Sequence, residues 1–155
     1  MLREGYAQLG RITYKAMTPL LRFYMTDKHH RVRVLLFNEF DEILLVRSWL
    51  GHQLWSLPGG GIQRQETPMQ AAVRELKEET GLIVRSHQIE ELGSFLNPYS
   101  AAPFTISCFT GLAKKQEPIA TQRSKLEVLD AGWFALHKLP TDYSPTIDKA
   151  LALRG

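Results

Sequence analysis

The chain has 155 residues, of which 44% are hydrophobic and 23% are charged, the composition of one ordinary globular domain. Its single cysteine, Cys108, excludes an internal disulfide and favours a reducing, cytoplasmic compartment. The net charge of +3 comes without the dense Lys and Arg stripe of nucleic-acid-binding proteins, and no apolar run is long enough to span a membrane. We therefore expect one domain over residues 1–155, with neither a nucleic-acid partner nor a membrane partner.

Residues 1–30 form an N-terminal extension in which only residues 17–25 have a readable pattern. That pattern is compatible with a short apolar helix, which we expect to pack on the domain rather than on a membrane or a partner protein. Alternating apolar residues then predict a strand over 31–38 and a partner strand over 42–49. A short extended segment over 55–57 follows.

The next predicted element is a helix that begins after a glycine-rich turn. Pro58 and the three glycines behind it interrupt regular structure. Thr67 is a good N-cap, Pro68 suits the first helical position, and Gln70 completes a capping box. Gly81 is the residue expected just beyond the end of a helix. The sequence therefore predicts a helix over residues 67–80.

The remainder of the chain predicts mostly strands. Apolar and β-branched residues predict strands over 91–96, 104–112 and 131–136, and a closing helix over 145–153. Strands joined mostly by short turns, with one strong central helix, favour an α+β fold with a mixed or antiparallel sheet.

Three carboxylates on the predicted helix carry the chemistry. Glu75, Glu78 and Glu79 are spaced so that they share one helix face. The apolar stripe holds the other face against the core, so we expect the acidic face to look outward into solvent or a cleft. Oxygen ligands alone suit a hard divalent cation, Mg²⁺ with Mn²⁺ as a substitute. Taken by itself, such a run is more typical of a plain solvated helix face than of a metal site.

The combination of glycine turn and acidic helix resembles the Nudix box. All nine fixed positions of that 23-residue motif are filled here, by Gly60, Glu66, Arg74, Glu75, Leu76, Glu78, Glu79, Gly81 and Leu82. The resemblance implies the Nudix fold, a mixed β-sheet in an α/β/α sandwich with a loop–helix–loop motif. It also implies Mg²⁺-dependent hydrolysis of a pyrophosphate bond in a nucleoside diphosphate linked to another moiety.

The resemblance further assigns roles to individual residues. It implies that the carbonyl of Gly59 binds metal together with Glu75, Glu78 and Glu79, and that Glu75 is the first candidate for the base that activates water. Arg74 would orient the carboxylates, and Glu66, Gly60 and Gly81 would support the motif. Glu127 lies six residues before Trp133, where MutT-like relatives place a further carboxylate. We expect it to be either a ligand or base, or a solvated loop residue.

The substrate is less constrained by the sequence. Beyond the box, the proline at position 98 resembles the pattern of ADP-ribose pyrophosphatases, whereas the adjacent Tyr99 resembles that of diadenosine polyphosphate hydrolases. Both residues could instead simply shape a loop. Phe95 is a candidate for stacking on a base. We favour a small-molecule nucleotide substrate: a nucleoside triphosphate, ADP-ribose or a nucleotide sugar, or a dinucleoside polyphosphate. An RNA 5′-pyrophosphohydrolase, a non-catalytic ligand-sensing Nudix domain and a homodimer remain open.

Overall fold

The computed structural model describes residues 30–49, 52–63, 65–97, 103–115 and 128–155. In chain order its elements are β1 (His30–Phe37), β2 (Glu42–Ser48), β3 (Trp55–Ser56), α2 (Pro68–Thr80), η1 (Ser86–Gln88), β4 (Ile89–Asn97), β5 (Phe104–Leu112), β6 (Val128–Ala135), η2 (Leu136–Lys138) and α4 (Thr146–Arg154). Every strand and helix predicted within these ranges is confirmed, with ends displaced by three residues or fewer. The helix predicted at 17–25 lies outside the described residues.

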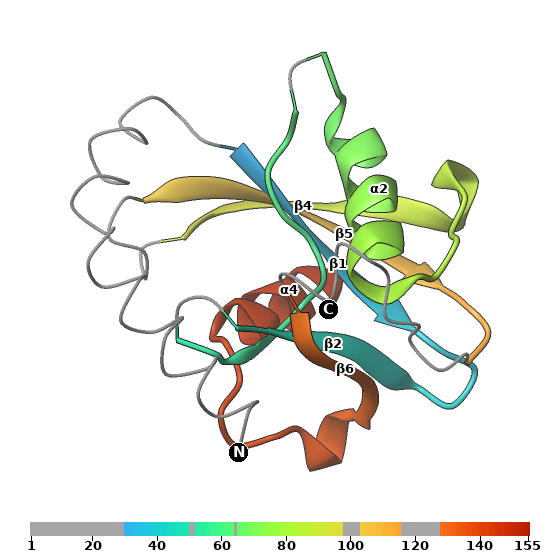
Figure 1. The fold of residues 1–155 in the computed structure, drawn as a ribbon, viewed down its shortest axis with the longest axis vertical. Helices are drawn as coiled ribbons and strands as arrows, with labels where there is room; N and C mark the ends of the chain where they lie inside the picture. Colours follow the sequence, from blue (N-terminus) through green and yellow to red (C-terminus); the bar gives the residue numbers. More distant parts are fainter. Residues whose placement is uncertain (1–29, 50–51, 64, 98–102, 116–127) are drawn as a thin grey trace.

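The strands form one mixed sheet that opens along its middle. The order is β3-β2-β1-β5-β4, with β6 paired to β2, and β1 runs parallel to β5 while the other pairs are antiparallel. Strands β1 and β2 pair only at Phe37 and Ile43 and then diverge (Figure 1). The predicted mixed sheet is therefore confirmed, and the divergence leaves room for another segment.

The segment that enters this opening is the glycine-rich turn. Strand β3 pairs with β2, and the chain then crosses to β1. There the amides of Val34 and Val32 donate to the carbonyls of Pro58 and Gly60, each at 2.9 Å. Gly59 is thereby held between these two hydrogen bonds, directly beside β1.

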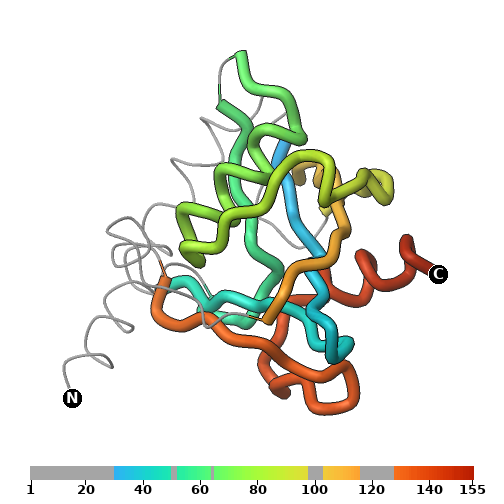
Figure 2. The backbone as a smooth tube through the Cα atoms, turned by 90° about the vertical axis from the view of Figure 1, so that its right-hand side faces the viewer, coloured from blue at the N-terminus to red at the C-terminus, as the bar shows by residue number. Residues whose placement is uncertain are grey.

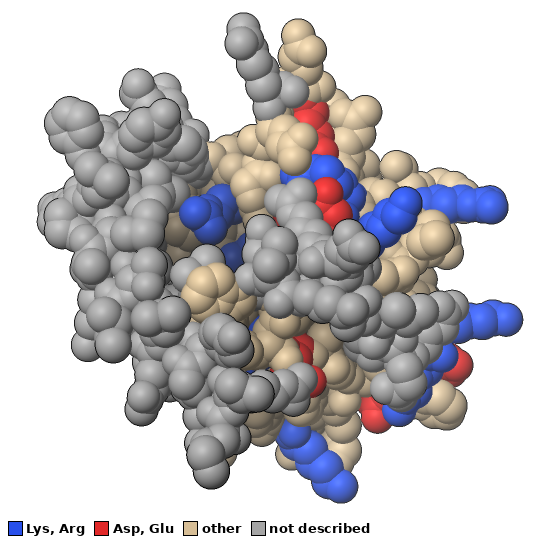
Figure 3. Space-filling view, viewed as in Figure 1, with Lys and Arg blue, Asp and Glu red and all other residues tan. Residues whose placement is uncertain are grey.

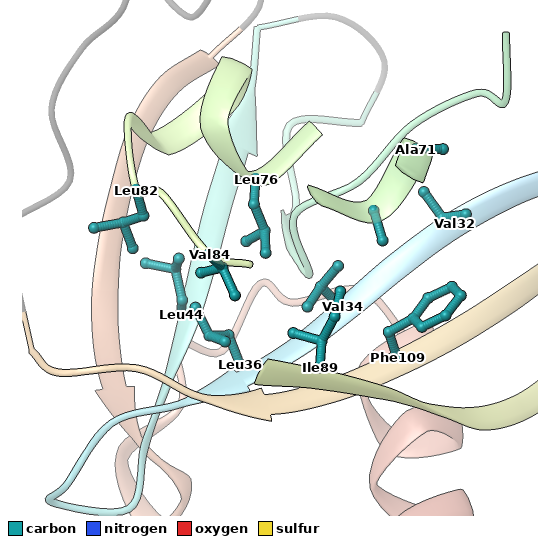
Figure 4. Close-up of a cluster of buried hydrophobic side chains, with 11 residues drawn as sticks. Val32, Val34, Leu36, Leu44, Ala71, Leu76, Leu82, Val84, Ile89 and Phe109 are labelled. Carbon is teal, nitrogen blue, oxygen red and sulfur yellow. The ribbon is translucent and has the colours of Figure 1, made fainter. Parts of the chain in front are cut away.

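Helices α2 and α4 lie on opposite sides of the sheet (Figures 1 and 2). Under α2, Ala71 and Leu76 pack with Val32 and Val34 of β1 in a fully buried cluster (Figure 4). A second buried cluster lies on the α4 side and includes Cys108, where burial raises the thiol pKa to about 11. This arrangement confirms the predicted α/β/α sandwich. No helix in the described ranges has the length and apolarity to cross a bilayer.

Helix α2 is fixed at both ends by the predicted caps. The Gln70 amide donates to Thr67 Oγ1 at 3.2 Å, and the Thr67 amide donates to Gln70 Oε1 at 2.8 Å. At the other end Gly81 adopts a φ of 73°, and its amide donates to the Lys77 carbonyl at 2.9 Å. The helix therefore starts and stops where its carboxylates can face the glycine turn.

Candidate functional site

Arg74 is the centre of the site, because all three of its guanidinium nitrogens have partners. Nε and Nη2 bind the two oxygens of Glu66 at 2.7 and 2.8 Å. Nη1 donates to Glu75 Oε1 at 2.7 Å and to Glu78 Oε2 at 2.9 Å, and Nη2 also donates to the Gly61 carbonyl at 2.9 Å. These ion pairs, with Glu66 first, raise the pKa of Arg74 above its ordinary value. One side chain thus fixes three carboxylates relative to the loop.

Glu66 joins the loop to the helix, as the resemblance implies. Besides its two-oxygen contact with Arg74, its Oε2 accepts a hydrogen bond from the Gln63 amide at 2.9 Å. The Arg74 hydrogen bonds hold the pKa of the Glu66 carboxyl below its ordinary value, although burial opposes them, and the Gln63 amide adds a smaller lowering effect. The carboxylate therefore stays charged at neutral pH and keeps the loop closed on α2.

Glu75 corrects one sequence-based expectation. The sequence predicts that the acidic face looks outward into solvent or a cleft, yet Glu75 is only 5% exposed and so does not face solvent. Its carboxylate lies against Gly60, where a Cβ atom would stand 2.6 Å from Oε1 and 3.0 Å from Oε2. The glycine turn covers this part of the helix face, so Glu75 is enclosed between the loop and Arg74. Glu78 and Glu79, one turn later, are partly exposed.

Gly59 and Glu79 form the second contact between loop and helix. The Gly59 amide donates to Glu79 Oε2 at 2.8 Å. Gly59 adopts a φ of 141°, and a Cβ atom there would lie 2.2 Å from the Val32 carbonyl oxygen. Only glycine fits this position, because the turn must approach β1 while its amide reaches the helix.

Arg33 of β1 also belongs to the site, and the sequence reasoning missed it. Its Nη1 donates to the carbonyl of Gly59, and to that of Val32 at 3.1 Å. Burial lowers the pKa of Arg33, while the nearby charges of Glu79 and Glu75 act in the opposite direction. The available signal was a charged residue between two valines of a strand, where an unpaired charge is costly.

The site holds more carboxylates than guanidinium groups among the described residues. Four carboxylates (Glu66, Glu75, Glu78 and Glu79) lie near two guanidinium groups (Arg33 and Arg74). Figure 3 shows acidic and basic side chains in contact beside α2. No three acidic, His or Cys side chains in the described part of the chain form a ready coordination shell, since these carboxylates are engaged by Arg74 and by the loop amide.

The donor chemistry nevertheless fits a hard divalent cation. Carboxylate and carbonyl oxygens are the ligands that Mg²⁺ and Mn²⁺ prefer. Glu78 and Glu79 are partly exposed, and the absence of a Cβ at Gly60 keeps space open beside Glu75. The residues of this site therefore suit Mg²⁺ or Mn²⁺.

Three other predicted site residues, Glu127, Pro98 and Tyr99, lie outside the described residues. Phe95 is described: it pairs with Ile106, which in turn pairs with Arg31, so the three side chains share one face of the sheet. Lys149 Nζ of α4 lies 5.9 Å from the centre of the Phe95 ring, and the ring packs partly against the α4-side cluster. Phe95 is thus on the same sheet face as Arg33 but is partly covered by α4.

Comparison with known proteins gives one family. The chain matches the NUDIX domain over residues 27–153. It is 45% identical over 62 residues to the RNA pyrophosphohydrolase of Marinomonas sp. (strain MWYL1), which covers 40% of this chain and 37% of that protein. The match thus spans well under half of that relative's length.

Solved structures agree on the fold. The MutT NUDIX hydrolase from Burkholderia pseudomallei superposes with a TM-score of 0.71 at 21% identity, covering 83% of this chain and 99% of that one. The NUDIX domain of Shewanella oneidensis NrtR, solved with ADP ribose, gives a TM-score of 0.65 at 24% identity, covering 85% and 91%. At these identities the likeness establishes the architecture alone.

Proposed function

The chain belongs to the NUDIX domain family, and from that premise we propose that it is a metal-dependent pyrophosphohydrolase acting on a nucleoside diphosphate linked to another moiety. The observation that carries the proposal is the convergence of Glu75, Glu78 and Glu79 on the glycine turn, where the turn also encloses the Glu75 carboxylate. A plain solvated helix face would not bury one of its carboxylates against a loop.

In this proposal Glu75, Glu78, Glu79 and the carbonyl of Gly59 hold Mg²⁺, for which Mn²⁺ can substitute. When bound, the ion would neutralise phosphate oxygens and lower the pKa of a water molecule. Within the protein, Arg74 keeps the Glu75 carboxylate fixed through Oε1, and the loop over Gly60 limits the access of bulk water to it.

In the proposed hydrolytic step, Glu75 accepts the proton of the attacking water. The water oxygen attacks one phosphorus atom, its proton passes to the Glu75 carboxylate, and the bridging P–O bond breaks with its electron pair on the leaving phosphate. Arg74 moves no proton, because its ion pairs hold its pKa above the ordinary value. Its part is to keep Glu75 and Glu78 in place.

A substrate panel tests the proposal. Purified protein with Mg²⁺ is offered nucleoside triphosphates, ADP-ribose, nucleotide sugars, dinucleoside polyphosphates and a 5′-triphosphate RNA, and products are identified by mass. The expected result is cleavage of one small-molecule class, lost in Glu79→Gln and retained in the exposed control Glu91→Gln. Absence of cleavage across the panel with Mg²⁺ and Mn²⁺ would contradict the enzymatic proposal in favour of ligand sensing.

A second candidate substrate is the 5′ end of RNA. The observation in its favour is the 45% identity to a bacterial RNA pyrophosphohydrolase over 62 residues. RNA binding neutralises several phosphates and so weakens steeply with salt. Cleavage of the 5′-triphosphate RNA with a steep salt dependence, and of no small nucleotide, would select this candidate.

A further inference from the structure

Arg33 places a positive charge inside strand β1. It sits in β1 between Val32 and Val34, which face α2, so its own side chain points to the other side of the sheet with its register partner Cys108. From there Nη1 reaches the Gly59 carbonyl of the glycine turn. A hydrophobic residue at this position would avoid the cost of placing a partly buried charge beside the core.

Arg33 uses fewer of its N–H donors than Arg74 does. Arg74 engages all three nitrogens, mainly with carboxylates. Within the described residues, both hydrogen bonds of Arg33 come from Nη1 and end on neutral carbonyls. A guanidinium has five N–H donors in a planar fork that matches phosphate oxygens. Among these residues Nε and Nη2 of Arg33 therefore have no acceptor.

The acceptor of Arg33 is the same carbonyl that the proposed function gives to the metal. A guanidinium and a divalent cation on one carbonyl oxygen repel each other strongly at this range. The repulsion falls when a polyanion lies between them. An arriving pyrophosphate group supplies that negative charge, because its oxygens can accept from Arg33 while the Gly59 carbonyl remains with the ion.

We propose that Arg33 is a phosphate-binding residue, which donates to the Gly59 carbonyl before substrate binds and then to the pyrophosphate group of the substrate. This proposal rests on the proposed function, since it takes the Gly59 carbonyl as a metal ligand. It adds a specific contact from β1, on the sheet face that also carries Arg31 and Phe95. The substrate phosphates would thereby lie beside Gly59 of the glycine turn, which both Arg33 and Glu79 of α2 contact.

The test separates metal binding from phosphate binding. Wild type, Arg33→Met and Arg33→Lys are compared with Arg85→Met. This control removes the same charge from the exposed residue that directly precedes the short helix η1. Mn²⁺ affinity is measured by electron paramagnetic resonance without substrate. Binding of imidodiphosphate, a pyrophosphate analogue with a non-hydrolysable bridge, is measured by calorimetry in the presence of Mn²⁺. Thermal unfolding checks that each variant folds.

Arg33→Met is expected to bind Mn²⁺ at least as tightly as wild type, because a competing cation has been removed. Its affinity for imidodiphosphate is expected to fall about 10- to 100-fold, the loss typical of a charged hydrogen bond. Arg33→Lys, which retains a point charge without the fork, is expected to lie between the two, and Arg85→Met to match wild type. With an identified substrate, KM should rise more than kcat falls.

Three outcomes would overturn the proposal. Unchanged imidodiphosphate affinity in a folded Arg33→Met that still binds Mn²⁺ would refute the phosphate contact and leave the proposed function intact. Weaker Mn²⁺ binding in Arg33→Met would instead assign Arg33 to bracing the Gly59 carbonyl. If wild type binds neither Mn²⁺ nor imidodiphosphate, the proposed function fails and the Arg33 proposal falls with it.

Discussion

Replacing Gly60 by alanine tests whether the glycine turn makes room for the Glu75 carboxylate. The backbone tolerates the change, because Gly60 is not among the glycines with positive φ. The new Cβ atom would stand 2.6 Å from Glu75 Oε1, whereas ordinary contact begins at 3.4 Å, so the carboxylate must withdraw by about 0.8 Å. A displacement of about 1 Å at a reacting group can lower turnover about 100-fold.

The expected stability effect of Gly60→Ala is modest. Reduced freedom of the unfolded chain stabilises the variant by about 0.4–1 kcal/mol. A weakened charged hydrogen bond between Arg74 and Glu75 costs about 1.5–3 kcal/mol. The free energy of unfolding should therefore fall by about 1–2 kcal/mol, far less than is needed to unfold a typical domain. Turnover and stability thus move by very different amounts.

The neighbouring glycines provide matched controls for the assay, which combines kcat on the identified substrate with urea unfolding. A Cβ at Gly61 meets no atom within 4 Å, so Gly61→Ala should keep both activity and stability. A Cβ at Gly59 meets the Val32 carbonyl at 2.2 Å, so Gly59→Ala should lose stability first. If Gly60→Ala were as active as Gly61→Ala, the position of Glu75 would not matter for turnover.

Three further predictions concern the charged cluster. Glu78→Gln and Glu79→Gln should each lower kcat with Mg²⁺ by about 10²- to 10⁴-fold at unchanged circular dichroism, and a near wild-type rate in either would refute the metal assignment. Glu66→Gln should be less stable than wild type above pH 4.5, the ordinary pKa of Glu, because the folded-state pKa is lowered. That difference in unfolding free energy should shrink as the pH falls below 4.5, and a constant difference would contradict the ion-pair account. Arg74→Lys should cost about 2 kcal/mol of stability, measured by urea unfolding, because a point charge cannot span its partners; an unchanged midpoint would refute the central role of Arg74.

The helix and its caps could be predicted from the sequence because their signals are local. Thr67, Gln70 and Gly81 act within one or two turns of their partners, and the structure places all three at the predicted caps. The strands followed from alternation in the same way. The Nudix box carries the resemblance to the family, and the spacing of Glu75, Glu78 and Glu79 within it predicts that they lie near one another.

The features that the sequence did not reveal depend on contacts between distant segments. The exposure of Glu75 is set by how the glycine turn lies over α2, which local periodicity does not report. Arg33 meets Gly59 across 26 positions, because β1 and β2 diverge and the turn enters between them. Alternation predicted a strand at Arg33 but could not say what the side chain would face. Local patterns therefore predicted the elements, while tertiary packing decides how the site is closed.

The charges of the cluster explain why it contains two arginines. With no arginine, four neighbouring carboxylates would repel one another and oppose the docking of the loop on α2. Arg33 and Arg74 offset part of this repulsion, while Glu78 and Glu79 remain partly exposed. Under the proposed function these carboxylates bind a divalent ion, and a bound pyrophosphate group brings the negative charge that any further cation needs.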